Sequence, residues 1–90
     1  MEWGAISFVM SSKLRFRILV LLKESQKTPT DLKLLVSTQL SNVSGSLKEL
    51  EEMGLVKCLT PERKKLRFYA ITEDGIKILD KINKITERKK

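Results

Sequence analysis

Residues 28–55, TPTDLKLLVSTQLSNVSGSLKELEEMGL, predict two short helices joined by a tight turn. Thr28 is a suitable N-cap, Pro29 sits at the first helical position, and Asp31 follows the cap at the spacing of a capping box. Gly54 is placed to end the second helix. The apolar stripes are Leu32, Leu35 and Val36 in the first helix and Val43, Leu47 and Leu50 in the second. Two short helices with a short turn are typical of a DNA-binding helix-turn-helix.

Several short motifs around this stretch resemble those of winged helix-turn-helix regulators, namely the arsenical-resistance-repressor-like and multiple-antibiotic-resistance-repressor-like families. The matching positions are 28–29, 32, 41–44, 47–51, 54–56 and 69–75. The resemblance implies a dimeric DNA-binding fold of the α+β class, mostly helical, whose second core helix enters the major groove. The sequence departs from the family at Gly45, where a basic residue is common, and at Ser37, where a glycine is common.

Composition limits the classes of protein. Ninety residues allow one domain, residues 1–90, and a hydrophobic content of 41% excludes intrinsic disorder. The net charge of +7 favours an acidic partner, with nucleic acid ahead of an anionic membrane surface. Only 6% of the residues are aromatic, which argues against a protein that stacks single-stranded bases.

The chemistry-bearing residue types are scarce. There is one cysteine, Cys58, and no histidine, so the chain cannot assemble a zinc site of the Cys/His type that many arsenical-repressor-like proteins use to sense metals. No nucleophile–base pair, paired-carboxylate pocket or glycine-rich phosphate loop is evident, so we expect no enzyme activity, no cofactor and no small-molecule ligand. The apolar start of the chain is too short to span a bilayer and lacks a basic leader, which predicts a cytoplasmic protein without a membrane partner.

The N-terminal segment, residues 1–11, fits two structures. Ile6, Phe8 and Met10 alternate as in a strand, whereas Trp3, Ile6 and Met10 share one helical face; we prefer the helix. The pair Ser11-Ser12 then starts a second helix that runs to about Lys23. Its apolar stripe is Leu14, Ile18, Leu21 and Leu22, and its cations Lys13, Arg15 and Arg17 are expected on a solvated face.

The second helix of the helix-turn-helix stretch, residues 28–55, has a polar half and an acidic half. Its N-terminal half presents small polar residues and one lysine, whereas Glu49, Glu51 and Glu52 would repel phosphate from its C-terminal half. DNA would therefore meet the N-terminal half, where the helix dipole favours anions. Asn42 and Gln39 could each read adenine through two hydrogen bonds. The candidate DNA-binding residues here are Gln39, Ser41, Asn42, Ser44, Gly45 and Lys48; ordinary polar surface remains the alternative.

After Gly54 the apolar period changes from that of a helix to that of a strand. Residues 55–72 predict a β-hairpin wing, with strands at 55–60 and 66–72 around a turn at 61–65. The densest positive charge of the chain falls on this turn, at Arg63, Lys64 and Lys65, and just beyond it, at Arg67. Such a hairpin after a helix-turn-helix contacts phosphates or the adjacent minor groove, and we prefer this interpretation to a merely solvated loop.

Thr72 is expected to cap the last helix, residues 73–90, with Glu73 and Asp74 in its first turn. Its apolar set is wider than one core-facing stripe requires. We expect Ile76 and Leu79 to pack inward and a dimer interface to form at Ile78, Ile82 and Ile85. The alternative is that the whole stripe packs against the N-terminal segment of the same chain.

The sequence thus predicts a homodimeric regulator of transcription that binds double-stranded DNA without catalysis. Three alternatives remain open. One is a winged helix that binds protein within a transcription or replication assembly, for which Leu40, where the family usually has a polar residue, is a hint. Another is a non-specific DNA-binding protein, since Gly45 lacks a base-reading side chain. The third, an RNA-binding protein, is disfavoured by the low aromatic content.

Overall fold

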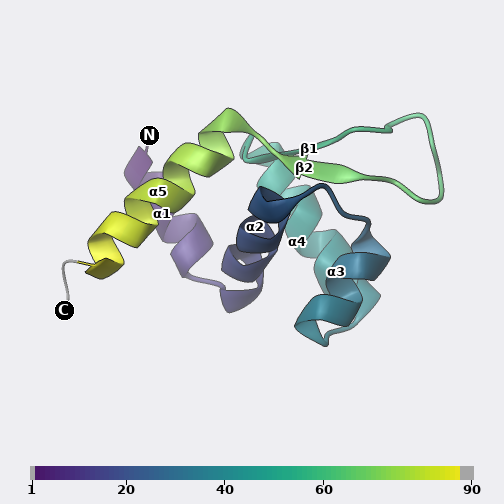
Figure 1. Cartoon of the computed structure of the whole chain (residues 1–90), viewed down its shortest axis with the longest axis horizontal. Coiled ribbons are helices and arrows are strands. Elements are labelled where there is room, and N and C mark those ends of the chain that lie inside the picture. The colour runs from purple at the N-terminus through teal and green to yellow at the C-terminus, as the bar shows by residue number, and fades with distance from the viewer. Residues whose placement is uncertain (1, 88–90) are drawn as a thin grey trace.

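The structure, a computed structural model, describes residues 2–87 (Figure 1). Within this range the elements are α1 (Glu2–Met10), α2 (Lys13–Glu24), α3 (Pro29–Val36), α4 (Leu40–Glu52), β1 (Val56–Cys58), β2 (Tyr69–Ile71) and α5 (Glu73–Glu87). Helix α2 lies in the middle and packs against α1, α3, α4, α5 and β2. The predicted α+β fold, a helix-turn-helix followed by a β-hairpin and a last helix, is confirmed.

The helix-turn-helix forms through the local signals of its sequence. The Thr28 hydroxyl accepts a hydrogen bond from the Asp31 amide, and the Asp31 carboxylate accepts one from the Thr28 amide, both at 3.1 Å. This capping box satisfies two amides that the first turn of α3 leaves without helical partners. Gly54 follows α4 with φ of 76°, a left-handed conformation that glycine adopts at little cost. The predicted helix start at Thr28 and helix end at Gly54 are both confirmed.

The turn between α3 and α4 contains a residue in the left-handed conformation, and this residue is a serine instead of a glycine. Ser37 adopts φ of 53° and ψ of 52°. Beside it, Leu32 and Val36 are buried while Leu35 is half exposed. The expectation that Leu35 joins the core is wrong, because α3 is short and buries only the line that joins Leu32 to Val36.

In α4, Val43, Leu47 and Leu50 are buried, as predicted. In α2, Ile18 and Leu22 are buried as expected, but Leu19 is buried too, whereas Leu14 and Leu21 are only partly covered. The buried face of α2 is therefore rotated from the predicted stripe, because this helix has neighbours on several sides.

The wing has shorter strands than predicted. Val56 pairs with Ile71 and Cys58 with Tyr69 in antiparallel register, and each strand has three residues. Regular pairing stops near Pro61, which has no amide hydrogen to donate. Residues 59–68 form a long loop that extends away from the helices (Figure 1). Lys27 lengthens the sheet on the other side, since it exchanges two backbone hydrogen bonds with Tyr69, at 3.1 and 2.9 Å.

The N-terminal segment forms helix α1, as predicted, but the buried face of this helix is not the predicted face of Trp3, Ile6 and Met10. Ala5, Ile6 and Val9 are buried, whereas Trp3 and Met10 are exposed. Helix α1 lies beside α5 (Figure 1) and contacts it.

This contact corrects the expectation for the last helix. Ile78 and Ile82 are buried within the chain, Ile85 is partly buried, and Ile76 is 37% exposed. The expectation that Ile76 packs inward and that Ile78 and Ile82 remain for a partner is wrong, because α1 and α2 cover that side of α5. The alternative of packing against the N-terminal segment is the one that occurs. The tail residues 88–90, which were included in the predicted last helix, lie outside the described residues.

Candidate nucleic-acid interface

The outer face of α4 carries the predicted major-groove residues. Ser41, Asn42, Ser44, Gly45 and Lys48 are all exposed, because Val43, Leu47 and Leu50 take the inward positions of the helix. No acidic residue lies in the first turn of α4, so its positive dipole end is not neutralised within the helix. The N-terminal half of α4 is therefore suited to an anion or to the edge of a base pair.

Two side chains at this helix start have amide groups. Gln39 is the exposed N-cap residue, and its side chain makes no capping hydrogen bond. The Asn42 amide nitrogen donates to the Thr38 hydroxyl at 3.1 Å. This contact orients Asn42 and uses one of its two amide hydrogens. One donor and the carbonyl acceptor remain, which is the pair that adenine recognition needs.

Gly45 has open space around it. A Cβ atom built on its backbone meets nothing within 4 Å. Packing therefore does not require a glycine at this position, and the helix backbone is accessible there.

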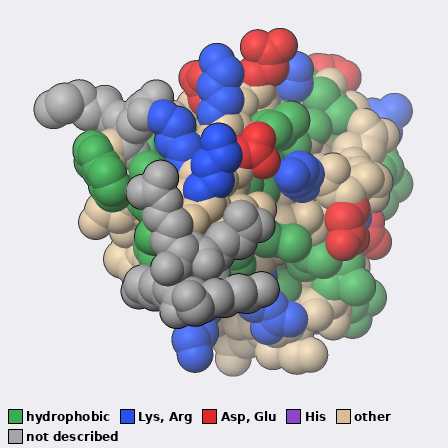
Figure 2. Space-filling model, turned by 60° about the vertical axis from the view of Figure 1, so that its left-hand side comes forward, with side chains coloured by type: hydrophobic (Ala, Val, Ile, Leu, Met, Phe, Trp, Pro, Cys, Tyr) green, Lys and Arg blue, Asp and Glu red, His purple; other side chains and the backbone are tan. Residues whose placement is uncertain are grey.

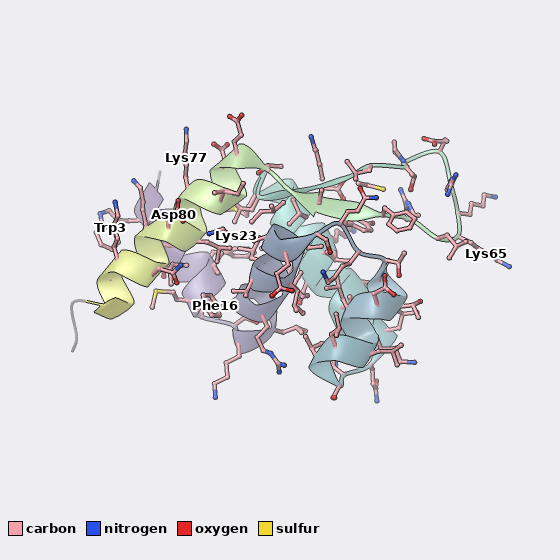
Figure 3. All side chains as sticks on the ribbon, viewed as in Figure 1. Trp3, Phe16, Lys23, Lys65, Lys77 and Asp80 are labelled. Carbon is pink, nitrogen blue, oxygen red and sulfur yellow. The ribbon has the colours of Figure 1, made fainter. Side chains whose placement is uncertain are left out.

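The wing holds its cations in two different environments. Arg63, Lys64 and Lys65 are exposed, and Figure 3 shows Lys65 at the far end of the loop, pointing away from the helices. Arg67 is partly buried; its guanidinium donates to the Pro61 carbonyl oxygen at 3.4 Å, while its buried Nε has no hydrogen-bond partner. Arg63, Lys64 and Lys65 are therefore accessible to phosphates. Arg67 instead joins two parts of the loop through its hydrogen bond to Pro61.

The wing and α4 face one another across a hollow of about 680 Å³. Its walls include Ser44 and Lys48 from α4 and Lys64, Lys65 and Arg67 from the wing. The structure thus brings together cations that are far apart in the sequence. Glu51 also lines the hollow, towards the C-terminal end of α4, so the positive side is the N-terminal one.

Tyr69 lines the same hollow and was not a predicted site residue. Burial raises the pKa of its phenol above the ordinary value, and the nearby Arg67 charge opposes this change. The phenol therefore stays protonated at neutral pH and retains a hydrogen to donate. Its β-strand position suggested only a structural residue.

Arg15 is a second residue that sequence reasoning missed. Its guanidinium binds the Glu49 carboxylate at 3.2 Å, donates to the Phe8 carbonyl at 2.8 Å and lies 4.0 Å from the centre of the Phe8 ring. The expectation that Arg15 is solvated is wrong, whereas Lys13 and Arg17 are exposed as expected. Arg15 joins α1 and α2 to α4 and neutralises one of the α4 carboxylates. Because Glu49 is 34 positions away in sequence, no local pattern indicates the pair.

A family model for the N-terminal domain of the methanogenesis regulatory protein FilR1 matches residues 4–75. The chain belongs to this family. The matched region starts within α1, includes α2 to α4 and the whole wing, and ends in the first turn of α5. No curated protein matches the sequence.

Solved structures of winged-helix regulators are similar in fold. ZitR of Lactococcus lactis has a TM-score of 0.74 at 20% identity, over 86% of this chain and 53% of that one. The homodimeric winged helix-turn-helix DNA-binding domain Mb0332 of Mycobacterium bovis has a TM-score of 0.77 at 20% identity, over 96% and 79%. AdcR of Streptococcus pyogenes has a TM-score of 0.72 at 18% identity, over 87% and 59%. The chain thus spans little more than half of ZitR and AdcR, and this likeness establishes the winged-helix fold.

Residues 2–87 contain neither a membrane-spanning helix nor a cluster of metal-ligating side chains. None of the helices combines the length and apolar character needed to cross a bilayer. No three side chains of the types that ligate metals gather at one place in this range.

Proposed function

We propose that this chain binds double-stranded DNA as a homodimer and regulates transcription without catalysis. The N-terminal half of α4 enters the major groove, and the wing contacts the phosphates beside it. One observation carries the proposal: Lys48 of α4 and the wing cations Lys64, Lys65 and Arg67 line the same hollow. A helix that enters one groove and a basic loop beside it suit a duplex, whose phosphate strand runs between adjacent grooves.

The comparisons support the proposal. ZitR has also been solved in a complex with DNA, in a structure with a TM-score of 0.70 to this chain. Mb0332 is described as a homodimeric DNA-binding domain. A protein-binding role for α4 is less well supported, because Leu40 is the only apolar side chain exposed on this helix.

The dimer surface that we propose lies at the α1 and α5 end of the chain, outside the buried Ile78 and Ile82. Trp3 is 73% exposed there, and Met10 is half exposed. Figure 2 brings this end forward and shows hydrophobic side chains at the surface between lysines and arginines. Trp3 and the wing lie at opposite ends of the long axis (Figure 3). A two-fold axis near Trp3 would direct both wings outward, towards half-sites about 10 bp apart or a multiple of that.

The wing cations provide the main test. Replacing Arg63, Lys64 or Lys65 singly with alanine should weaken binding about equally on all duplexes, because phosphates carry no sequence information. Each change should also reduce the slope of log K against log salt by about one unit, measured by fluorescence anisotropy over a salt series. Arg17→Ala, on the exposed side of α2 and outside the hollow, removes the same charge as a control. Wing variants that behave like this control would refute the proposal.

Asn42 tests sequence readout. Asn42→Ala should lose about 1–3 kcal/mol of binding free energy on a duplex selected from a random pool, and little on random DNA. The same comparison applies to Gln39→Ala. Gln26→Ala, in the exposed loop before α3 and outside the hollow, serves as the matched control. Equal losses on both kinds of duplex would make the protein a non-specific DNA binder.

Sedimentation of the unmodified chain with and without the selected duplex tests the dimer. We expect two chains per palindromic duplex. A chain that remains a monomer in both conditions at tens of micromolar would contradict this part of the proposal.

A further inference from the structure

Leu66 has an unfavourable backbone conformation at the tip of the wing. Its φ is 54°, in the left-handed region. Glycine, asparagine and aspartate adopt this region readily, whereas the Cβ of a leucine crowds the backbone there. Leucine is thus a poor choice for the turn itself.

Packing does not account for the leucine either. Its side chain is 70% exposed and is absent from the apolar cluster of the core. The contacts of the folded chain therefore do not explain a large apolar side chain in this strained position.

The neighbours of Leu66 indicate the kind of partner that this side chain would contact. Lys64, Lys65 and Arg67 lie on either side of it in the sequence, and all of them line the hollow between the wing and α4. Leu66 lines that hollow as well. An apolar side chain held among phosphate-binding cations would be carried to a groove of the duplex.

We propose that Leu66 is a wedge that enters the minor groove next to the α4 site and partly unstacks one base step. This inference rests on the proposed DNA binding and adds a preference for deformable DNA. Apolar side chains act in this way in proteins that bend DNA through the minor groove. Pyrimidine–purine steps such as TA unstack most easily, so one such step is expected beneath the wing.

The test uses Leu66→Asn, because asparagine tolerates the left-handed backbone and removes the apolar wedge. The duplexes carry either a TA step or an AA step within an A-tract at the wing position. The unmodified chain should prefer the TA duplex about tenfold, and Leu66→Asn should lose this preference while keeping its salt slope. The melting temperature of the variant should stay the same or rise, since backbone strain is relieved.

A second measurement detects unstacking directly. With 2-aminopurine at the TA step, fluorescence should rise when the unmodified chain binds and should not rise with Leu66→Asn. Leu34→Asn is the matched control, because Leu34 is also 70% exposed but lies on α3 outside the hollow. This control should retain the TA preference and the fluorescence change.

The outcomes separate the two proposals. An unmodified chain that binds no duplex would overturn both. An unmodified chain that binds DNA with the same affinity, TA preference and fluorescence as Leu66→Asn would overturn only the wedge. The wedge would also be overturned if Leu66→Asn had a lowered melting temperature and lost affinity equally for both duplexes. Leu66 would then have a structural role.

Discussion

Replacing Ile82 with glutamate is expected to unfold the domain. Ile82 is 2% exposed and packs in the core, where α5 meets α1. A carboxylate there would be desolvated, and the substitution also removes the apolar contacts of isoleucine. Changes of this kind cost about 4 kcal/mol or more, close to the total stability of a small domain. Circular dichroism should show lost helix signal at 25 °C or a greatly lowered melting temperature.

The same substitution on the exposed side of α5 is the control. Ile76 is 37% exposed and lies in the first turn, where a negative charge opposes the positive end of the dipole. Ile76→Glu should therefore change the free energy of unfolding by less than about 1 kcal/mol. If the unmodified chain is a dimer and Ile82→Glu is a folded monomer, then Ile82 is an interface residue. In that case α5 does not bury Ile82 within its own chain.

Gly75→Ala should be the second most damaging change. The added Cβ would meet the Leu55 carbonyl oxygen at far less than contact distance and would lie 2.5 Å from Cγ1 of Ile71. The Gly75 amide also donates to the Thr72 hydroxyl, which donates in turn to the Gly54 carbonyl. Moving α5 outward to admit a methyl group would disturb this link between the end of α4 and the start of α5. Overpacking of this kind costs about 1–3 kcal/mol, and the melting temperature should fall by about 4–8 °C for each kcal/mol.

Gly45→Ala provides the matched control for this prediction. Gly45 also lies in a helix, but an added Cβ meets nothing within 4 Å. Alanine should therefore stabilise α4 by about 0.5–1 kcal/mol, because it restricts the unfolded chain and has a higher helix propensity. Opposite shifts of the two melting temperatures are the expected result. A stabilised Gly75→Ala variant would show that α5 does not approach Leu55 as closely as described.

Local sequence signals were sufficient wherever a structural feature depends on residues within one helical turn. The Thr28–Asp31 capping box, the Thr72 cap and the left-handed Gly54 form from neighbours in the sequence. The exposed residues of α4 follow from the helical period once the apolar positions are known. For this reason the sequence predicts the helix-turn-helix, the wing and the exposed side chains of α4.

Other features depend on how the elements pack. Helical periodicity places Ile78 and Ile82 on the apolar side of α5, but it does not state whether α1 or a second chain covers them. The Arg15–Glu49 pair and the tight approach of Gly75 to Leu55 join segments that are distant in sequence. The strained backbone of Leu66 and the hollow between the wing and α4 likewise exist only in the folded chain.

The sequence by itself determined the helix caps, the helix ends and the residues that share a helical face, because these depend on interactions within a few residues. Only the tertiary structure decided which faces meet and which cations gather, since those contacts depend on the positions of whole elements.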